Sequence, residues 1–165
     1  MKKFTLTILL AIFLNACSDS RVDSSAYSVI LNTLLSHSAE EVSILQTDEK
    51  ENVIYIDARS NLEFDVSHIK DAKFIGYDTL NFKTLESLQK DEEIIIYCSV
   101  GYRSEIVCHK LSELGFTNVS NLYGGLFEWI NQSKPIVDGE GNITDRVHAF
   151  DKTWGIWLNK GEKVY

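Results

Sequence analysis

The sequence predicts an α/β domain in which a central parallel sheet is flanked by helices on both faces. Two β-branched runs, Val53–Ile56 and Ile94–Tyr97, have the continuous apolar character of strands that are buried on both faces. Segments with helical spacing of apolar residues alternate with these runs. The second strand leads into a loop, residues 98–104, that opens a helix, and this edge of an α/β sheet is where ligands bind.

The other elements follow in chain order. Helices are predicted over Tyr27–His37 and Phe82–Gln89, and a third over Glu105–Leu114 with Gly115 as its C-terminal stop. A hairpin is predicted between Pro135–Val137 and Ile143–Thr144.

The loop between the second strand and the third helix carries a candidate nucleophile. Its sequence is Cys98-Ser99-Val100-Gly101-Tyr102-Arg103-Ser104. Backbone N–H groups of such a loop can surround the sulfur, and the dipole of the following helix favours negative charge. Both effects, with the charge of Arg103, stabilise the thiolate, which is the reactive form. A buried inert cysteine is the alternative, but the ordered strand, loop and helix favour a nucleophile.

The loop resembles the C-x-x-G-x-R-S active-site loop of the rhodanese family of sulfurtransferases. The resemblance covers roughly residues 27–133, with Ser67 and Asp71 standing where the family usually has glycine. The other matching segments are Tyr55–Arg59 (first strand and Asp-x-Arg turn), Glu63-Phe64, Ser67–Ala72, Gly115-Phe116, Val119, Leu122, Gly124-Gly125 and Trp129.

The resemblance implies a double displacement. Cys98 takes a sulfur atom from thiosulfate or a polysulfide, becomes a persulfide, and passes the sulfur to a thiol or cyanide. The amides of residues 99–104 are expected to hold the persulfide, and Val100 and Tyr102 to face the substrate. Asp57 and Arg59 are expected to support the site from behind, with Arg59 free to pair with Glu63, four positions on. No metal and no organic cofactor is expected.

Two other functions stay open. Cell-cycle dual-specificity phosphatases resemble rhodaneses but have one more residue between cysteine and arginine, so the shorter loop here favours sulfur over phosphate. The second alternative is a binding or sulfur-sensing module that does not turn over. Retention of Cys98, Gly101, Arg103 and Ser104 favours activity.

The N-terminal sequence predicts that the protein is located in a bacterial cell envelope. Lys2-Lys3 precede the apolar run Phe4–Leu14, which is too short to span a membrane. Leu14-Asn15-Ala16-Cys17 resembles a lipobox, so residues 1–16 are expected to be a signal peptide and Cys17 to carry lipid. Residues 17–26 read as a flexible tether, and Ser18 favours the outer membrane, facing the periplasm. Plain secretion and an uncleaved anchor are the alternatives.

Residues 134–165 extend past the usual end of the family's domain, which leaves residues 27–133 as the rhodanese-like part. This extension is too apolar to lie free in water, so it is expected to pack as an accessory layer; a lid or a docking surface for a protein partner is the alternative. The acidic turn at residues 138–142 does not fit a calcium loop, because Ile143 stands at the sixth position and Ala149 at the twelfth.

Composition bounds the class of partner. The 165 residues suit one domain and carry a net charge of −8. This charge argues against nucleic acid as a partner and leaves small sulfur compounds as the expected substrates. Cys108 lies on the apolar side of its helix and is expected to pack, with a disulfide to Cys98 as the alternative.

Overall fold

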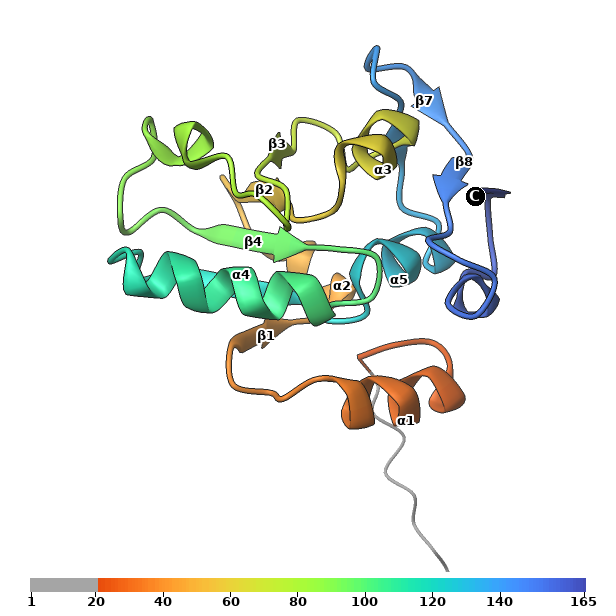
Figure 1. Ribbon diagram of the computed structural model, residues 1–165. Coiled ribbons are helices and arrows are strands. Elements are labelled where there is room, and N and C mark those ends of the chain that lie inside the picture. The colour runs from red at the N-terminus through yellow and green to blue at the C-terminus, as the bar shows by residue number, and fades with distance from the viewer. Residues whose placement is uncertain (1–20) are drawn as a thin grey trace, which may run out of the picture.

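The computed structural model describes residues 21–165 and confirms the predicted α/β fold (Figure 1). Five strands form the main sheet in the order β1-β5-β4-β2-β3, and every neighbouring pair is parallel. The strands are β1 (Glu40–Val42), β2 (Ile54–Asp57), β3 (Lys73–Phe74), β4 (Ile94–Tyr97) and β5 (Val119–Leu122).

Helices cover both faces of this sheet, as the sequence predicts. The helices are α1 (Ser25–Leu34), α2 (Ile44–Thr47), α3 (Asn61–Val66), α4 (Tyr102–Glu113) and α5 (Gly125–Asn131), with 3₁₀ turns η1 (Phe82–Leu85) and η2 (Gly155–Trp157). Within residues 21–165, no helix combines the length and the apolar character needed to cross a membrane.

The central strand β4 divides the core into two clusters. Ile94 and Ile96 pack in one cluster with Val107 of α4, whereas Ile95 and Tyr97 pack in the other with side chains of α1 and α5. Successive strand residues point to opposite faces, so α4 covers one face of the sheet and α1 and α5 the other. Each fully buried isoleucine stabilises the fold by about 1.5–3 kcal/mol relative to exposure.

Helix α4 begins three residues earlier than the sequence predicted. It starts at Tyr102, directly after Gly101. The φ of Gly101 is 114°, a backbone angle that glycine adopts without steric strain. The second half of the cysteine loop is therefore the first turn of the helix. Consequently, α4 begins only four residues after Cys98, and the positive end of its dipole lies close to the cysteine loop.

The predicted flexible tether is wrong over residues 21–26. Helix α1 begins at Ser25 and is capped by the Ser24 side chain, which accepts from the Tyr27 N–H at 3.3 Å. Val22 is buried and Arg21 pairs with Glu41. A buried valine and a formed helix cap hold this segment against the domain. Residues 17–20 of the tether and the signal peptide at residues 1–16 lie outside the described residues.

The helix predicted over residues 82–89 is only the four-residue turn η1. Two hydrogen bonds tie this stretch back to β3 and the loop after it. The Thr84 hydroxyl donates to the Phe74 carbonyl at 2.6 Å, and the Asn81 N–H donates to the Ile75 carbonyl at 2.8 Å. These bonds join residues ten and six positions apart and hold the segment in a compact turn.

The C-terminal extension packs on the domain, as its apolar sequence indicated. The predicted hairpin is present as β6 (Ile136–Val137) paired antiparallel with β7 (Ile143–Thr144). A second pair, β8 (Arg146–His148) and β9 (Glu162–Val164), is parallel. Between and beside these strands, Val147, Ala149 and Leu158 are buried in the same cluster as α1 and α5, and Trp157 stacks on Tyr27 with ring centroids 5.4 Å apart. In Figure 1 the extension closes the side of the sheet beside α5.

Candidate active site

Cys98 lies at the carboxyl end of β4, where the loop turns into α4. Its side chain is 1% exposed, and the Gly101 N–H donates to the sulfur at 3.1 Å. The start of α4 adds the positive end of a twelve-residue helix. Of the loop amides expected at the sulfur, the Gly101 N–H makes this contact, and the helix dipole also favours negative charge there.

The outward carbonyls of this loop are held by the start of α5. The Leu126 N–H donates to the Cys98 carbonyl at 2.8 Å, and the Phe127 N–H donates to the Ser99 carbonyl at 3.0 Å. The close approach depends on Gly125, because a Cβ there would lie 2.5 Å from the Cys98 carbonyl oxygen. The start of α5 therefore holds the carbonyls of Cys98 and Ser99, while the Gly101 N–H points to the sulfur.

A second anchor holds the far end of the loop. The Asn121 side-chain amide, fully buried in β5, donates to the Gly101 carbonyl at 3.0 Å. The Ser104 hydroxyl donates to Asn121 Oδ1 at 2.7 Å and lies 3.1 Å from the same Gly101 carbonyl. Ser104, a predicted loop residue, therefore positions the loop and does not line the cavity. The sequence analysis missed Asn121, which no local motif marks.

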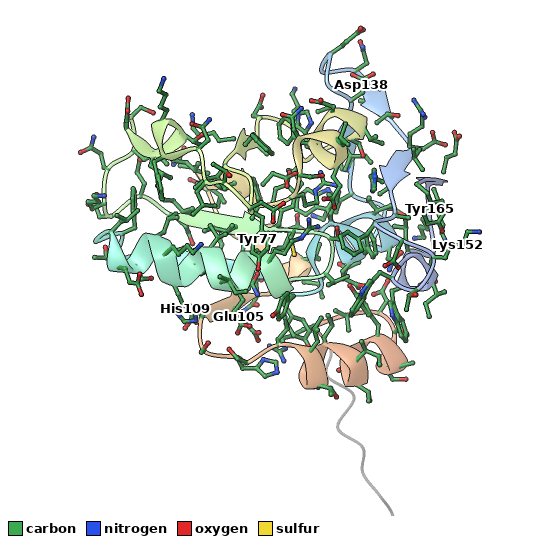
Figure 2. All side chains as sticks on the ribbon, viewed as in Figure 1. Tyr77, Glu105, His109, Asp138, Lys152 and Tyr165 are labelled. Carbon is green, nitrogen blue, oxygen red and sulfur yellow. The ribbon has the colours of Figure 1, made fainter. Side chains whose placement is uncertain are left out.

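Helix α4 is also fixed from the side that faces the segment before β1 (Figure 2). There, Glu105 accepts hydrogen bonds from the backbone N–H groups of Ser36 and Ser38, at 3.0 and 3.1 Å. His109, one turn further along, lies 2.7 Å from the Ser38 hydroxyl. Burial alone would raise the pKa of Glu105, but these backbone hydrogen bonds lower it below its usual value. The carboxylate form therefore ties α4 to the chain between α1 and β1.

Arg103 forms a clamp with Glu63 and Ser99. Its two terminal nitrogens donate to the Glu63 carboxylate at 2.8 and 2.7 Å, and the Ser99 hydroxyl donates to Glu63 at 3.0 Å. Burial alone would raise the pKa of Glu63, but the hydrogen bonds and charge of Arg103 lower it to about 2. Burial likewise opposes the charge of Arg103, whereas Glu63 and the negative sulfur of Cys98 raise the pKa of the guanidinium. Both partners are therefore charged at neutral pH.

The expected Arg59–Glu63 pair is wrong. Arg59 is fully buried and pairs with Asp57, with Nε and Nη2 at 2.7 to 3.1 Å from its carboxylate oxygens. Nη2 also donates to the Ser67 carbonyl at 2.6 Å. Burial opposes the charge of Arg59, and the Asp57 carboxylate raises its pKa above the usual value. This pair supports the end of β2 from inside the protein and does not line the cavity described next.

A cavity of about 370 Å³ opens above the sulfur. Val100 and Tyr102 line it, as the sequence predicted, and Phe150 and Trp154 of the extension form a further wall. Tyr77, which is labelled in Figure 2, completes an aromatic rim. The complete set of lining residues is Leu34, Tyr77, Cys98, Ser99, Val100, Tyr102, Arg103, Phe150 and Trp154.

The second thiol, Cys108, is separate from this chemistry. It is 2% exposed within the α4 side of the core, and both Cys98 and Cys108 are free thiols. Burial raises the pKa of Cys108 well above its usual value, so it stays a neutral thiol. Its packing role matches the expectation.

The acidic turn of the extension binds its own backbone. Asp138 Oδ1 accepts from the N–H groups of Glu140 and Asn142 at 3.0 and 2.9 Å. Across residues 21–165, no cluster of three or more His, Cys, Asp or Glu side chains has the arrangement of a metal site. The predicted lipidation residue Cys17 lies outside the described residues.

The fold and site together define an α/β domain with a cradled cysteine at a strand end. Residues 38–132 match the family model of the rhodanese-like domain. This match covers more than half of the chain, and the chain belongs to the rhodanese-like domain family.

Two relatives illustrate the range of that family. A sulfurtransferase from Allochromatium vinosum is 33% identical over 93 residues, which are 56% of this chain and 86% of that protein. A tRNA uridine(34) hydroxylase from Acholeplasma laidlawii is 32% identical over 133 residues, which are 76% of this chain and 40% of that protein. The chain therefore spans well under half of the length of the hydroxylase.

Solved structures agree on the fold. A protein from Bacillus halodurans aligns with a TM-score of 0.51 and 25% identity, covering 70% of this chain and 86% of that one. A rhodanese-like domain from Anabaena aligns with a TM-score of 0.52 and 20% identity, covering 70% and 80% of the two chains.

Proposed function

We propose that this protein is a sulfurtransferase that carries sulfane sulfur on Cys98. The observation that carries the proposal is the position of the Cys98 sulfur. It lies at a helix start, 3.1 Å from the Gly101 N–H, beside the Arg103 guanidinium and at the base of an open cavity. Such preorganised donors stabilise negative charge on sulfur before and after transfer.

The proposed reaction is a double displacement in which the sulfur stays covalently bound between steps. The Cys98 thiolate attacks the outer sulfur of thiosulfate or a polysulfide, a new S–S bond forms, and the donor leaves with the electron pair of the broken S–S bond. The persulfide anion then lies in the space lined by Val100, Tyr102 and Arg103. A thiol or cyanide attacks its outer sulfur and regenerates the Cys98 thiolate. Neither transfer step changes the total number of electrons of the reacting molecules, so the proposed reaction needs no cofactor.

Three observations support this proposal over its alternatives. The loop of six residues from Cys98 to Arg103 is one residue shorter than that of the cell-cycle dual-specificity phosphatases, which resemble rhodaneses. Cys98 lines a cavity of about 370 Å³, which gives a small sulfur donor a place to bind beside the nucleophile. The net charge of −8 disfavours tRNA as a substrate, although tRNA appears in the names of several relatives.

The test is a mass measurement on the purified protein after incubation with thiosulfate or with polysulfide. The proposal expects a gain of one sulfur atom on Cys98, reversed by cyanide and absent in Cys98→Ser. The matched control is Cys108→Ser, which should still gain the sulfur. No gain with either donor, while Cys98 remains reduced and alkylatable, would refute the proposal for these donors, and hydrolysis of an aryl phosphate would favour the phosphatase.

We also propose that Cys17 carries a lipid that anchors the protein in a bacterial envelope, in the outer membrane facing the periplasm. The support is the sequence Leu14-Asn15-Ala16-Cys17 after a basic start and an apolar run. Labelled fatty acid should be incorporated into the wild type and not into Cys17→Ala. Equal labelling of both would refute lipidation at this residue, and release of both into the soluble fraction would favour plain secretion.

A further inference from the structure

The cavity above Cys98 is walled by residues that lie outside the matched family domain. That domain ends at residue 132 and begins at residue 38. Leu34 comes from the end of α1, before the domain, and Phe150 and Trp154 come from the extension after it. The residues around the reacting sulfur thus lie within the matched domain, whereas three of the lining residues, Leu34, Phe150 and Trp154, lie outside it.

The extension holds the Phe150 ring at the cavity in a constrained backbone. Phe150 has a φ of 65°, which is unusual for a residue with a bulky side chain, and such strain is concentrated at functional sites. It is fixed on one side by buried Ala149, whose N–H donates to the Val164 carbonyl at 2.8 Å. Phe150 is 46% exposed, and its ring centroid lies 5.1 Å from the Arg103 guanidinium carbon.

Trp154 is fixed by a separate set of bonds. Asp151 Oδ1 accepts from the N–H groups of Thr153 and Trp154 at 2.7 and 2.9 Å, and the Gly155 N–H donates to the Asp151 carbonyl at 2.8 Å. Trp154 also packs against the main hydrophobic cluster. These backbone hydrogen bonds therefore hold the segment that carries the two aromatic side chains.

The one cationic side chain of the described cavity lining is already paired before any substrate enters. Within the described lining, Arg103 is the one cationic side chain, and the Glu63 carboxylate already engages two of its nitrogens. In the proposed reaction, the attacking Cys98 thiolate adds a further negative charge. A small dianion such as thiosulfate finds no unpaired cation here, whereas an apolar group finds aromatic and aliphatic walls. The volume of about 370 Å³ suits a small organic molecule.

We infer that the extension turns this site into one for an organic sulfur compound with an aromatic or branched apolar group. This inference rests on the proposed sulfur transfer and names its substrate class. The Cys98 thiolate attacks the outer sulfur of R–S–S⁻ or R–SO₂–S⁻, one S–S bond forms and one breaks, and R–S⁻ (after protonation, the thiol) or R–SO₂⁻ leaves with the electron pair. The R group lies between Phe150, Trp154 and Leu34.

The test uses three donors that separate charge from shape. Thiosulfate is a dianion, methanethiosulfonate is a small monoanion, and benzenethiosulfonate is a monoanion with a ring. The rate of sulfur loading on Cys98 is measured by mass for each donor. Each rate is divided by the rate of the same donor with a free low-molecular-weight thiol, which removes differences in intrinsic reactivity.

The wild type should prefer benzenethiosulfonate over methanethiosulfonate by about tenfold after this correction, since aromatic contacts contribute that much in a desolvated site. Methanethiosulfonate should in turn exceed thiosulfate. Phe150→Ala and Trp154→Ala should each remove most of the preference for the ring. Ile156→Ala is the matched control, because Ile156 is 61% exposed in the same segment and does not line the cavity.

A readout without turnover complements the rates. Inert benzenesulfonate should protect Cys98 from alkylation better than methanesulfonate in the wild type and in Ile156→Ala, and this difference should disappear in Phe150→Ala. Thermal unfolding of each variant shows that it is folded, and Phe150→Ala serves if Trp154→Ala does not fold.

The outcomes separate the two proposals. If Cys98 is loaded but the ring preference is absent, or is equal in the wild type and Phe150→Ala, the inference about the extension is overturned and sulfur transfer stands. If thiosulfate is the best donor after correction, the charge argument is overturned. If no donor loads Cys98 while benzenesulfonate still protects it, the proposed transfer fails and the apolar binding site stands.

Discussion

The close contact between α5 and the cysteine loop makes Gly125→Ala the sharpest single perturbation of the site. Gly125 has a φ of 59°, and an added Cβ would lie 2.5 Å from the Cys98 carbonyl oxygen and 2.7 Å from the Ser99 carbonyl carbon. Ordinary contacts between such atoms are about 3.5 Å, so the loop must move by about 1 Å. The atoms in contact are backbone, which cannot rotate away.

The magnitude has two parts that a control separates. A positive φ costs alanine about 1–2 kcal/mol of stability relative to glycine, and this applies equally to Gly115, whose φ is 89° and whose added Cβ would meet nothing within 4 Å. The displacement of the loop applies to Gly125 alone. A misplacement of about 1 Å costs roughly 100-fold in rate, because Cys98 and its amide donors no longer align.

The assay is sulfur loading of Cys98, followed by mass, together with thermal unfolding. Gly115→Ala should lower Tm by roughly 2–8 °C and leave the loading rate unchanged. Gly125→Ala should lower Tm further and reduce loading by about two orders of magnitude. If Gly125→Ala loads sulfur at the rate of Gly115→Ala, the contact with α5 does not set the loop geometry and the reasoning is refuted.

Three further perturbations follow from buried groups. The pKa of Glu63 falls from its ordinary 4.5 to about 2, so the ionised form contributes about 3 kcal/mol of stability at neutral pH, lost as pH falls from about 4.5 to about 2. In unfolding curves measured as a function of pH, Glu63→Gln should lack this acid-dependent loss of stability. It should also slow sulfur loading, because Arg103 loses its partner. A pH profile of stability that is the same as that of the wild type would contradict the clamp. Cys108→Ser should cost about 1–3 kcal/mol in chemical denaturation, because it buries a hydroxyl, without changing the loading rate; slower loading would give Cys108 a role in the reaction. Arg59→Met should cost about 3–5 kcal/mol, since it leaves the Asp57 carboxylate buried without its partner; a variant as stable as the wild type in denaturant would show that the pair is not needed.

The sequence could predict the cysteine loop because its parts are contiguous. Residues 94–97 form a strand by their β-branched composition, and Gly115 follows the end of α4. Every one of these signals is local. The first turn of α4 was nevertheless missed, because Tyr102–Ser104 have no helical apolar pattern of their own.

The partner of Glu63 shows where local reasoning fails. Arg59 and Glu63 are four apart, a spacing that pairs side chains within a helix. However, α3 begins at Asn61, so Arg59 lies before the helix and turns back to Asp57. The Glu63 carboxylate instead accepts from the Ser60 N–H and from Arg103, which lies forty positions further along the chain.

By itself, the sequence determined the α/β class, the position of the cysteine at a strand end and the loop that follows it, because these features depend on side-chain periodicity and on neighbouring residues. The neighbours that reach the sulfur's loop from elsewhere in the chain became visible only in the folded structure. Asn121, Glu63 and the walls Phe150 and Trp154 meet the loop from distant parts of the chain. No short-range sequence pattern specifies these contacts, because they form only when strands and helices pack and bury their apolar faces together.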